Sequence, residues 1–319
     1  MTQPSIQLRH RTASPQLLGQ STGLHPILQR VFSARGITSF AETDYALSGL
    51  IAPQRLSHIE QAARLLAEHM QQQSMILVFG DYDADGATST ALCIRALKML
   101  GHQRMDYLLP DRVSDGYGVS QNAAEKIIEH NPDLVITVDT GIASFSGLQQ
   151  LADAGIDVIV TDHHLPADRL PTARVIVNPN AFADAGGKNL AGVGVAFYLM
   201  LALRMQLRQQ GWFEQRAEPN LAECLDLVAL GSIADLVPLD YNNRVLVSEG
   251  LKRIRAGLCS RGISKLIELS GRRQAAISSQ DIAFAIAPRI NAAGRLQDMS
   301  IGVQTLLAEN DASAHDLAL

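Results

Sequence analysis

The feature that most constrains the fold is a short apolar run followed directly by acidic residues, a pairing that occurs three times. The runs and the residues after them are Met75 to Phe79 before Gly80-Asp81-Tyr82-Asp83-Ala84-Asp85-Gly86, Leu134 to Val138 before Asp139-Thr140-Gly141, and Ile156 to Thr161 before Asp162-His163-His164. Apolar runs of this length are typical of buried parallel strands. Because ligands bind outside the carboxyl ends of such strands, we expect these side chains to meet in one site.

The segments between the runs have helical patterns, so strands and helices alternate along the chain. We expect strands at 75–79, 104–109, 134–138, 156–160 and 174–177, and helices at 88–100, 121–129 and 145–154. This alternation predicts an α/β fold, a parallel twisted sheet flanked by helices with right-handed crossovers. The expected regions are a helical N-terminal arm over 1–70, the α/β domain over 71–240 and a helix-rich C-terminal segment over 241–319.

The three alternating aspartates between glycines, Asp81, Asp83 and Asp85, can direct several oxygens at one point. Like charges this close require a cation. A calcium loop begins in the same way, but its twelfth position must be glutamate and is Leu92 here. A single aspartate, such as Asp139, could instead cap a following helix. Oxygen ligands with one or two imidazoles favour Mg²⁺ or Mn²⁺ over structural zinc.

A further acidic residue, Asp235, follows the mostly apolar helical stretch Leu221 to Leu230. An aspartate in such surroundings needs a partner. From the residues alone, a backbone amide or an arginine would serve as well as a metal, so this alternative stays open.

Taken together, these segments resemble the four motifs of the DHH phosphoesterase superfamily in order and spacing. The motifs are Gly80 to Gly86, Asp139-Thr140-Gly141, Thr161 to His164, and Ala234-Asp235-Leu236-Val237-Pro238-Leu239. Flanking segments resemble the RecJ-type members, which are exonucleases specific for single-stranded DNA: Leu24 to Leu28, Ala34 to Ile37, Gly116-Tyr117-Gly118, and Ala287 to Leu296. The resemblance covers nearly the whole chain.

The resemblance implies a metal-dependent phosphodiesterase that removes nucleotides from the 5′ end of single-stranded DNA in repair and recombination. The runner-up is a relative that acts on short oligonucleotides, cyclic dinucleotides or pyrophosphate. A module that binds nucleic acid or a partner with little turnover is the alternative from a different class. The protein partners that the resemblance suggests are a single-strand-binding protein or a helicase.

Position by position, the resemblance implies two divalent cations, Mn²⁺ or Mg²⁺. One would be held by Asp81, Asp83 and Asp139, and the other by Asp85, Asp139, His163 and Asp235, with Asp139 bridging. Asp162 is expected to support the histidine pair. His164 is then free to contact the scissile phosphate or to protonate the leaving oxygen.

The chain departs from the family pattern in two places. Many relatives carry a histidine where this chain has Phe79, so Asp81 is the expected substitute ligand. RecJ-type proteins also continue into a DHHA1 domain and an oligonucleotide-binding fold, so residues 241–319 are expected to lead towards an absent second domain.

The net charge of −5 does not favour a nucleic-acid partner, but the distribution of charge matters more than the sum. From Lys252 to Arg273 there are seven basic residues and one acidic residue, a stretch that could follow a phosphate backbone or form a solvated helix face. Arginines suit bidentate phosphate contacts. The candidates are Arg112, Arg289 and Arg295, the last two flanking small residues, Asn291 to Gly294, that would let a ligand come close.

Aromatic residues are only 5% of the chain, so few platforms for base stacking exist. The candidates near the motifs are Phe79, Tyr82, Tyr117 and Tyr198. The most apolar helix candidate, Ala191 to Leu203, is too short to cross a bilayer, and Met1 to Ser14 is polar, so we expect a cytoplasmic protein without a membrane partner. Three widely spaced cysteines argue against a disulfide framework.

Overall fold

The computed structural model describes residues 23–112, 114–183, 186–296 and 298–318. It divides into two compact units, Met1–Gly49 and Leu50–Leu319. The described part of the first unit contains helix α1 (Pro26–Ala34) and 3-10 turns at Phe40–Thr43 and Leu47–Gly49. Helix α1 begins with proline, and the His25 side chain before it accepts a hydrogen bond from the Ile27 amide. No residue of α1 is buried.

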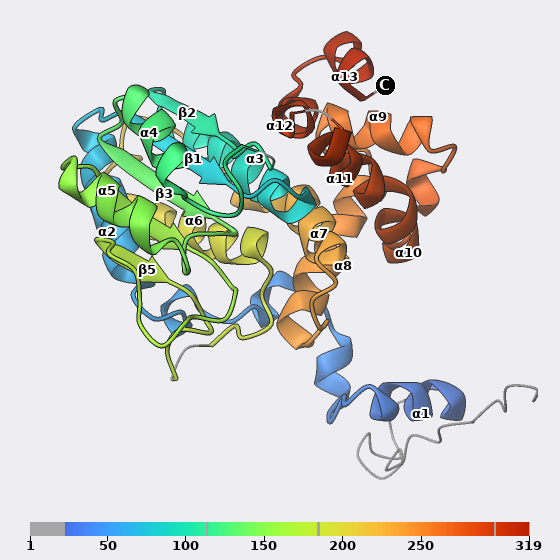
Figure 1. Ribbon diagram of the computed structural model, residues 1–319. Helices are drawn as coiled ribbons and strands as arrows, with labels where there is room; N and C mark the ends of the chain where they lie inside the picture. The colour runs from blue at the N-terminus through green and yellow to red at the C-terminus, as the bar shows by residue number, and fades with distance from the viewer. Residues whose placement is uncertain (1–22, 113, 184–185, 297, 319) are drawn as a thin grey trace, which may run out of the picture. The chain divides into compact units, whose positions relative to one another are not determined.

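The second unit contains a five-stranded parallel sheet in the order β2-β1-β3-β4-β5 (Figure 1). The strands are β1 (Ile76–Gly80), β2 (Met105–Leu108), β3 (Leu134–Val138), β4 (Asp157–Thr161) and β5 (Val175–Val177). In the register, Gly80 lies opposite Val138, and Val138 lies opposite Thr161. The three central strands therefore end level with one another, and the polar residues that follow them emerge at one edge. The expected α/β fold is confirmed.

Helices cover both faces of the sheet because successive strand residues point to opposite sides. Ile76 and Val78 belong to one core, with α2 (Ile59–Gln71), α3 (Ala84–Met99) and α6 (Gly192–Gln209). Leu77 and Phe79 belong to the other, with α4 (Gln121–Glu129) and α5 (Phe145–Asp153). The result is three layers, helix, sheet and helix.

One expected boundary is wrong. The helix predicted over 88–100 begins at Ala84, four residues earlier, because Asp83 caps it. The Asp83 carboxylate accepts hydrogen bonds from the amides of Asp85 and Gly86. The last three residues of the acidic heptapeptide are therefore in the first turn of a helix rather than in a loop.

After β5 the described residues form helices and turns and no further strand. Besides α6, they are α7 (Leu225–Ala234), α8 (Tyr241–Arg255), α9 (Arg261–Leu269), α10 (Ser279–Asp281), a π-helical turn (Ile282–Ile286), α11 (Ala287–Leu296), α12 (Ser300–Leu307) and α13 (Asp311–Ala318), with 3-10 turns at Leu221–Cys224 and Gln274–Ala276. Another 3-10 turn, Pro53–Arg55, precedes α2. In the described part of the chain, no helix combines the length and hydropathy needed to cross a bilayer.

A buried ion pair joins these helices to the α/β layers. Arg95 of α3 donates to both carboxylate oxygens of Asp226 in α7, at 3.1 and 3.2 Å. The same carboxylate accepts from the amide of Ser260, the residue before α9, at 2.7 Å. Asp226 is fully buried, so its charge depends on these donors.

We predict that Asp226→Ala lowers the free energy of unfolding by about 3–5 kcal/mol, because it leaves the Arg95 charge partly buried without its partner. Urea denaturation followed by circular dichroism measures the change. The double variant Arg95→Met, Asp226→Leu should recover most of the loss, since it leaves neither charge behind. A loss under about 1 kcal/mol in the single variant would contradict the assigned role.

Candidate metal centre

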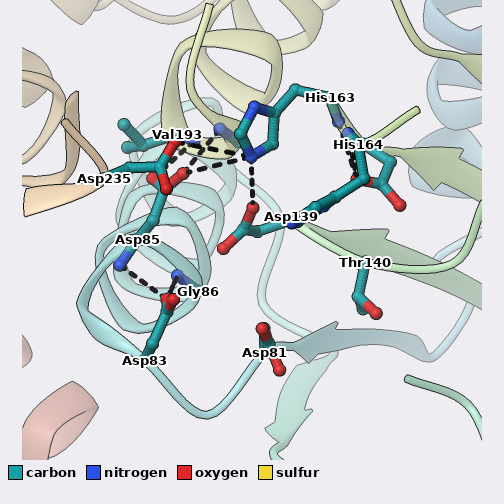
Figure 2. Close-up of polar contacts among 12 residues, drawn as sticks. Asp81, Asp83, Asp85, Gly86, Asp139, Thr140, His163, His164, Val193 and Asp235 are labelled. Atoms are coloured by element: carbon teal, nitrogen blue, oxygen red, sulfur yellow. Dashed lines mark hydrogen bonds and ion pairs between the residues drawn. The ribbon is translucent and has the colours of Figure 1, made fainter. Parts of the chain in front are cut away.

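The predicted site residues meet at the carboxyl edge of the sheet (Figure 2). Asp81 follows β1 directly, Asp139 follows β3, and Asp162 with the two histidines follows β4. The other acidic residues come from helix ends: Asp83 and Asp85 from the start of α3, and Asp235 from the end of α7.

Three overlapping groups of side chains have potential ligand atoms within 4.8 Å of one another. They are Asp81, Asp83 and Asp139; Asp85, His163 and Asp235; and Asp139, His163 and His164. The first group is the set expected for one cation, and the second contains three of the four residues expected for the other. Asp139 is common to two of the groups, as a bridging ligand would be.

Asp139 has the backbone conformation of a tight turn, with φ of +60°. Aspartate tolerates this left-handed region better than most residues. The Thr137 hydroxyl donates to the carbonyl of Thr140 at 2.8 Å and closes the turn. A side chain at Gly141, where φ is +113°, would collide with that hydroxyl, which explains the glycine of the second motif.

The N-terminus of α6 holds Asp85. The amides of Gly192 and Val193 donate to the two carboxylate oxygens at 2.7 and 3.0 Å (Figure 2). A Cβ at Gly192 would lie 2.5 Å from the side chain of Asp139, so only glycine allows the helix to come this close. These two amides have no partner within the helix, so their bonds to Asp85 and the helix dipole both favour its negative charge.

The carboxylates nevertheless destabilise one another's charged forms. Burial and the neighbouring charge of Asp83 raise the pKa of Asp81 to about 7, and the same two causes raise the pKa of Asp235 to about 6. Burial, together with the charges of Asp235 and Asp83, raises the pKa of Asp85 well above its usual range. Burial and the charge of Asp85 do the same to the pKa of Asp139. At neutral pH this cluster requires protons or cations.

His163 faces the carboxylates with an acceptor atom. Its Nε2 lies 3.1 Å from Asp139 Oδ1, 3.6 Å from Asp235 Oδ2 and 3.9 Å from Asp85 Oδ2. Burial and the adjacent ring of His164 lower the pKa of His163 to about 4, so the ring is neutral at pH 7.

The neutral ring is oriented as a ligand would be. Within the described residues, neither His163 Nε2 nor Asp139 Oδ1 has a hydrogen-bond partner. His163 Nε2 therefore faces carboxylate oxygens without a hydrogen bond, an arrangement that a cation between them would stabilise. The donor set of oxygens and imidazole fits Mn²⁺ or Mg²⁺.

Asp162 supports the histidine pair. Its Oδ1 accepts from the amides of His163 and His164 at 2.7 and 3.0 Å and lies 2.8 Å from His164 Nδ1, while Oδ2 accepts from the amide of Ile142. Burial opposes the charge, but the bonds from His164 and Ile142 outweigh it and lower the pKa of Asp162. The hydrogen bond between Asp162 and His164 raises the pKa of His164 to about 8. The His164 side chain is 44% exposed.

A comparison with family models matches residues 75–232 to the DHH family, N-terminal domain. This chain belongs to the DHH family.

Individual relatives agree with that assignment. The chain is 49% identical over 316 residues to the single-stranded-DNA-specific exonuclease RecJ of Escherichia coli (strain K12), covering 98% of this chain and 55% of that protein. A crystal structure of exonuclease RecJ bound to manganese matches with a TM-score of 0.74 at 40% identity, over 84% of this chain and 65% of that one. RecJ from Thermus thermophilus in complex with Mg²⁺ matches with a TM-score of 0.70 at 32% identity, over 95% of this chain and 39% of that one. The chain thus spans about half the length of the E. coli relative.

The predicted phosphate-binding arginines have different surroundings in this DHH protein. Arg112 is exposed, with its guanidinium 5.0 Å from the centre of the Tyr82 ring, beside the motif that carries Asp81. Arg289 is exposed, and its guanidinium donates to the carbonyl of Leu269 at 3.4 Å rather than to an acidic side chain of the site. Arg295 belongs to α11, and its side chain lies outside the described part of the structure.

Two other expectations are wrong. Phe79 and Tyr198 are fully buried in the two cores and are not available to stack on bases. The small residues near the end of α11 admit protein backbone rather than ligand: Asn291 accepts from the amide of Ala84 at 2.8 Å, and a Cβ at Gly294 would lie 2.5 Å from the carbonyl oxygen of Tyr82. This segment therefore braces the acidic motif.

The basic stretch Lys252 to Arg273 is largely paired with nearby acidic side chains, which favours the solvated helix face. Its ion pairs are Lys252 with Glu249, Arg261 with Asp311, Lys265 with Glu268 and Arg272 with Asp281. The sequence analysis did not predict that the amides of Gly192 and Val193 bind Asp85. The available signal was a helix that begins Gly-Val-Gly without a polar cap residue.

We predict that Asp139→Asn stabilises the metal-free protein at pH 7.5 by roughly 1–3 kcal/mol, because it removes a buried charge without a hydrogen-bond partner. The folded pKa of Asp139 is raised, so the stability that its bound proton contributes is present below the unfolded value near 4 and is lost as pH rises. The gain should therefore vanish near pH 4. Urea denaturation in chelator at both pH values measures it. A destabilised variant at pH 7.5 would contradict the repulsion described above.

Proposed function

We propose that this chain is the catalytic core of a manganese- or magnesium-dependent exonuclease that removes nucleotides from single-stranded DNA in the 5′→3′ direction. The observation that carries the proposal is the cluster of buried Asp81, Asp85 and Asp139 with half-buried His163, whose acceptor atoms belong to overlapping groups at distances that fit divalent cations. The printed names of its relatives supply the substrate, single-stranded DNA. Polarity and a role in repair and recombination come from the family resemblance.

The cluster divides into ligands for two cations. Asp81, Asp83 and Asp139 would hold one, and Asp85, Asp139, His163 and Asp235 the other. Two such cations supply charge neutralisation of the phosphodiester, a more acidic bound water, and stabilisation of the attacking and leaving oxygens.

The rest of the site serves the substrate. The Asp162 carboxylate orients the His164 ring, which is open to solvent, so that a nitrogen can donate to a phosphate oxygen or to the leaving group. Tyr117, 48% exposed, lies edge-on between the rings of Tyr82 and His164, and Arg112 lies over Tyr82. These four side chains form a polar and aromatic wall that suits a nucleotide next to the phosphate.

The proposal keeps two further expectations. Single-stranded DNA as the substrate is consistent with a cytoplasmic location. A single-strand-binding protein or a helicase as partner remains a prediction.

We predict that the chain with Mn²⁺ shortens a 3′-labelled, 5′-phosphorylated single strand progressively from its 5′ end, and that Asp139→Ala abolishes this activity. Gel separation of the labelled products over time is the measurement. Asp139→Ala removes a carboxylate common to both proposed cation sites, so we expect activity to fall by more than about 10³-fold. Asp153→Ala, at the exposed end of α5, is the matched control and should retain activity.

Other results would change the assignment. An intact strand together with hydrolysis of dinucleotides would favour the small-substrate alternative. Substantial activity in Asp139→Ala would contradict the metal centre itself. Binding of the strand without hydrolysis of either substrate would favour the binding module.

A further inference from the structure

The backbone of the histidine pair is held by the side chains of the preceding residue and of the segment after β5. Both of its amides donate to one carboxylate oxygen of Asp162, as described above. Its two carbonyl groups accept from two asparagines that follow β5. The four backbone groups of His163 and His164 therefore each have a side-chain partner of the opposite hydrogen-bonding type.

The asparagine contacts are short and specific. Asn178 Nδ2 donates to the carbonyl of His164 at 2.9 Å, and Asn180 Nδ2 donates to the carbonyl of His163 at 2.6 Å. The Asn180 amide in turn donates to Asn178 Oδ1 at 2.7 Å, which fixes the two side chains relative to each other. Asn178 is only 1% exposed, and Asn180 is half-buried.

Pairing of the sheet brings these residues together. Thr161, the last residue of β4, lies opposite Val177, the last residue of β5. The Asp162 amide continues the ladder by donating to the Val177 carbonyl at 3.2 Å. The segments after the two strands therefore start side by side, with Asn178 next to the Asp162-His163-His164 segment. Proline at 179 restricts the backbone between the two asparagines.

We propose that Asn178 and Asn180 are positioning residues that set the orientation of the two histidines, and with it the geometry of the metal centre. Both side chains donate to a carbonyl, and the oxygen of Asn178 also accepts from the Asn180 amide. An aspartate of the same shape would place a carboxylate oxygen against a carbonyl oxygen and leave the carbonyl without its donor.

The two asparagines act on different histidines, so their losses should differ. Asn180 holds His163, whose Nε2 faces the carboxylates of Asp139, Asp85 and Asp235. Asn178 holds His164, whose ring contacts Asp162 and is open to the substrate side. Loss of the Asn180 donor should weaken cation binding. Loss of the Asn178 donor should lower kcat more than it weakens cation binding.

The test measures Mn²⁺ affinity by isothermal titration calorimetry, and kcat and KM on single-stranded DNA, for the full chain and its variants. Because supporting partners of metal ligands typically contribute 10- to 100-fold, Asn180→Asp should weaken Mn²⁺ binding by on the order of 10-fold. Asn178→Asp should lower kcat by a similar factor, with KM nearly unchanged. Asn180→Ser, which keeps a shorter donor, should recover part of the affinity.

The matched control is Gln274→Glu, which removes the same kind of bond at a residue that is half-buried, as Asn180 is. Gln274 Nε2 donates to the carbonyl of Ile254 at 2.9 Å, outside the four motif segments. Thermal unfolding checks that each variant folds. If Asn178→Asp does not fold, Asn180→Asp still tests the proposal, because Asn180 is only half-buried. The control should be destabilised but retain wild-type Mn²⁺ affinity and kcat.

This inference rests on the proposed function, and the experiment separates the two. Wild-type protein that binds no Mn²⁺ would overturn the proposed metal centre. Wild-type protein that binds Mn²⁺, with folded Asn180→Asp and Asn178→Asp variants unchanged in affinity and kcat, would overturn the positioning role alone. Equal losses in Gln274→Glu would overturn it as well, since general destabilisation would then explain the effect.

Discussion

Electrostatic repulsion among buried carboxylates is the interaction on which the rest of this structure depends. The edge of the sheet brings Asp81, Asp85 and Asp139 out of water and close together, and burial and mutual repulsion raise the pKa of each carboxyl group. The surrounding chain reduces this cost only in part, through two amides at the start of α6 that bind Asp85. A folded protein that keeps such a cluster has a site suited to cations.

The fold serves this cluster by placing rigid elements around it. Level strand ends deliver Asp81, Asp139 and Asp162 to one edge, and alternation of side chains anchors each strand in two separate cores. The end of α7 supplies Asp235, and the ion pair between Arg95 and Asp226 fixes α7 against α3. Small residues at helix contacts let backbones approach the carboxylates closely. Ligand atoms from distant segments are thereby held by packing rather than by flexible loops.

The sequence predicted those features that depend on local pattern. Short Val- and Ile-rich runs marked the strands, and polar residues directly after them marked the site. Features that depend on the meeting of distant segments could not be predicted. The sequence could not say which of three aspartates caps α3, because a cap and a ligand share one residue type; the structure assigns the cap to Asp83. Nor could it show that Asn178 and Asn180 reach the histidines, because their distance depends on strand pairing.

The most direct test of the central claim, that repulsion in this cluster is balanced by two divalent cations, is anomalous diffraction at the manganese edge from crystals soaked in Mn²⁺. The account predicts two peaks on either side of Asp139, one near Asp81 and Asp83 and the other near Asp85, His163 and Asp235, separated by roughly 3.5–4 Å. The absence of anomalous density at Asp139, or density confined to other parts of the surface, would contradict it.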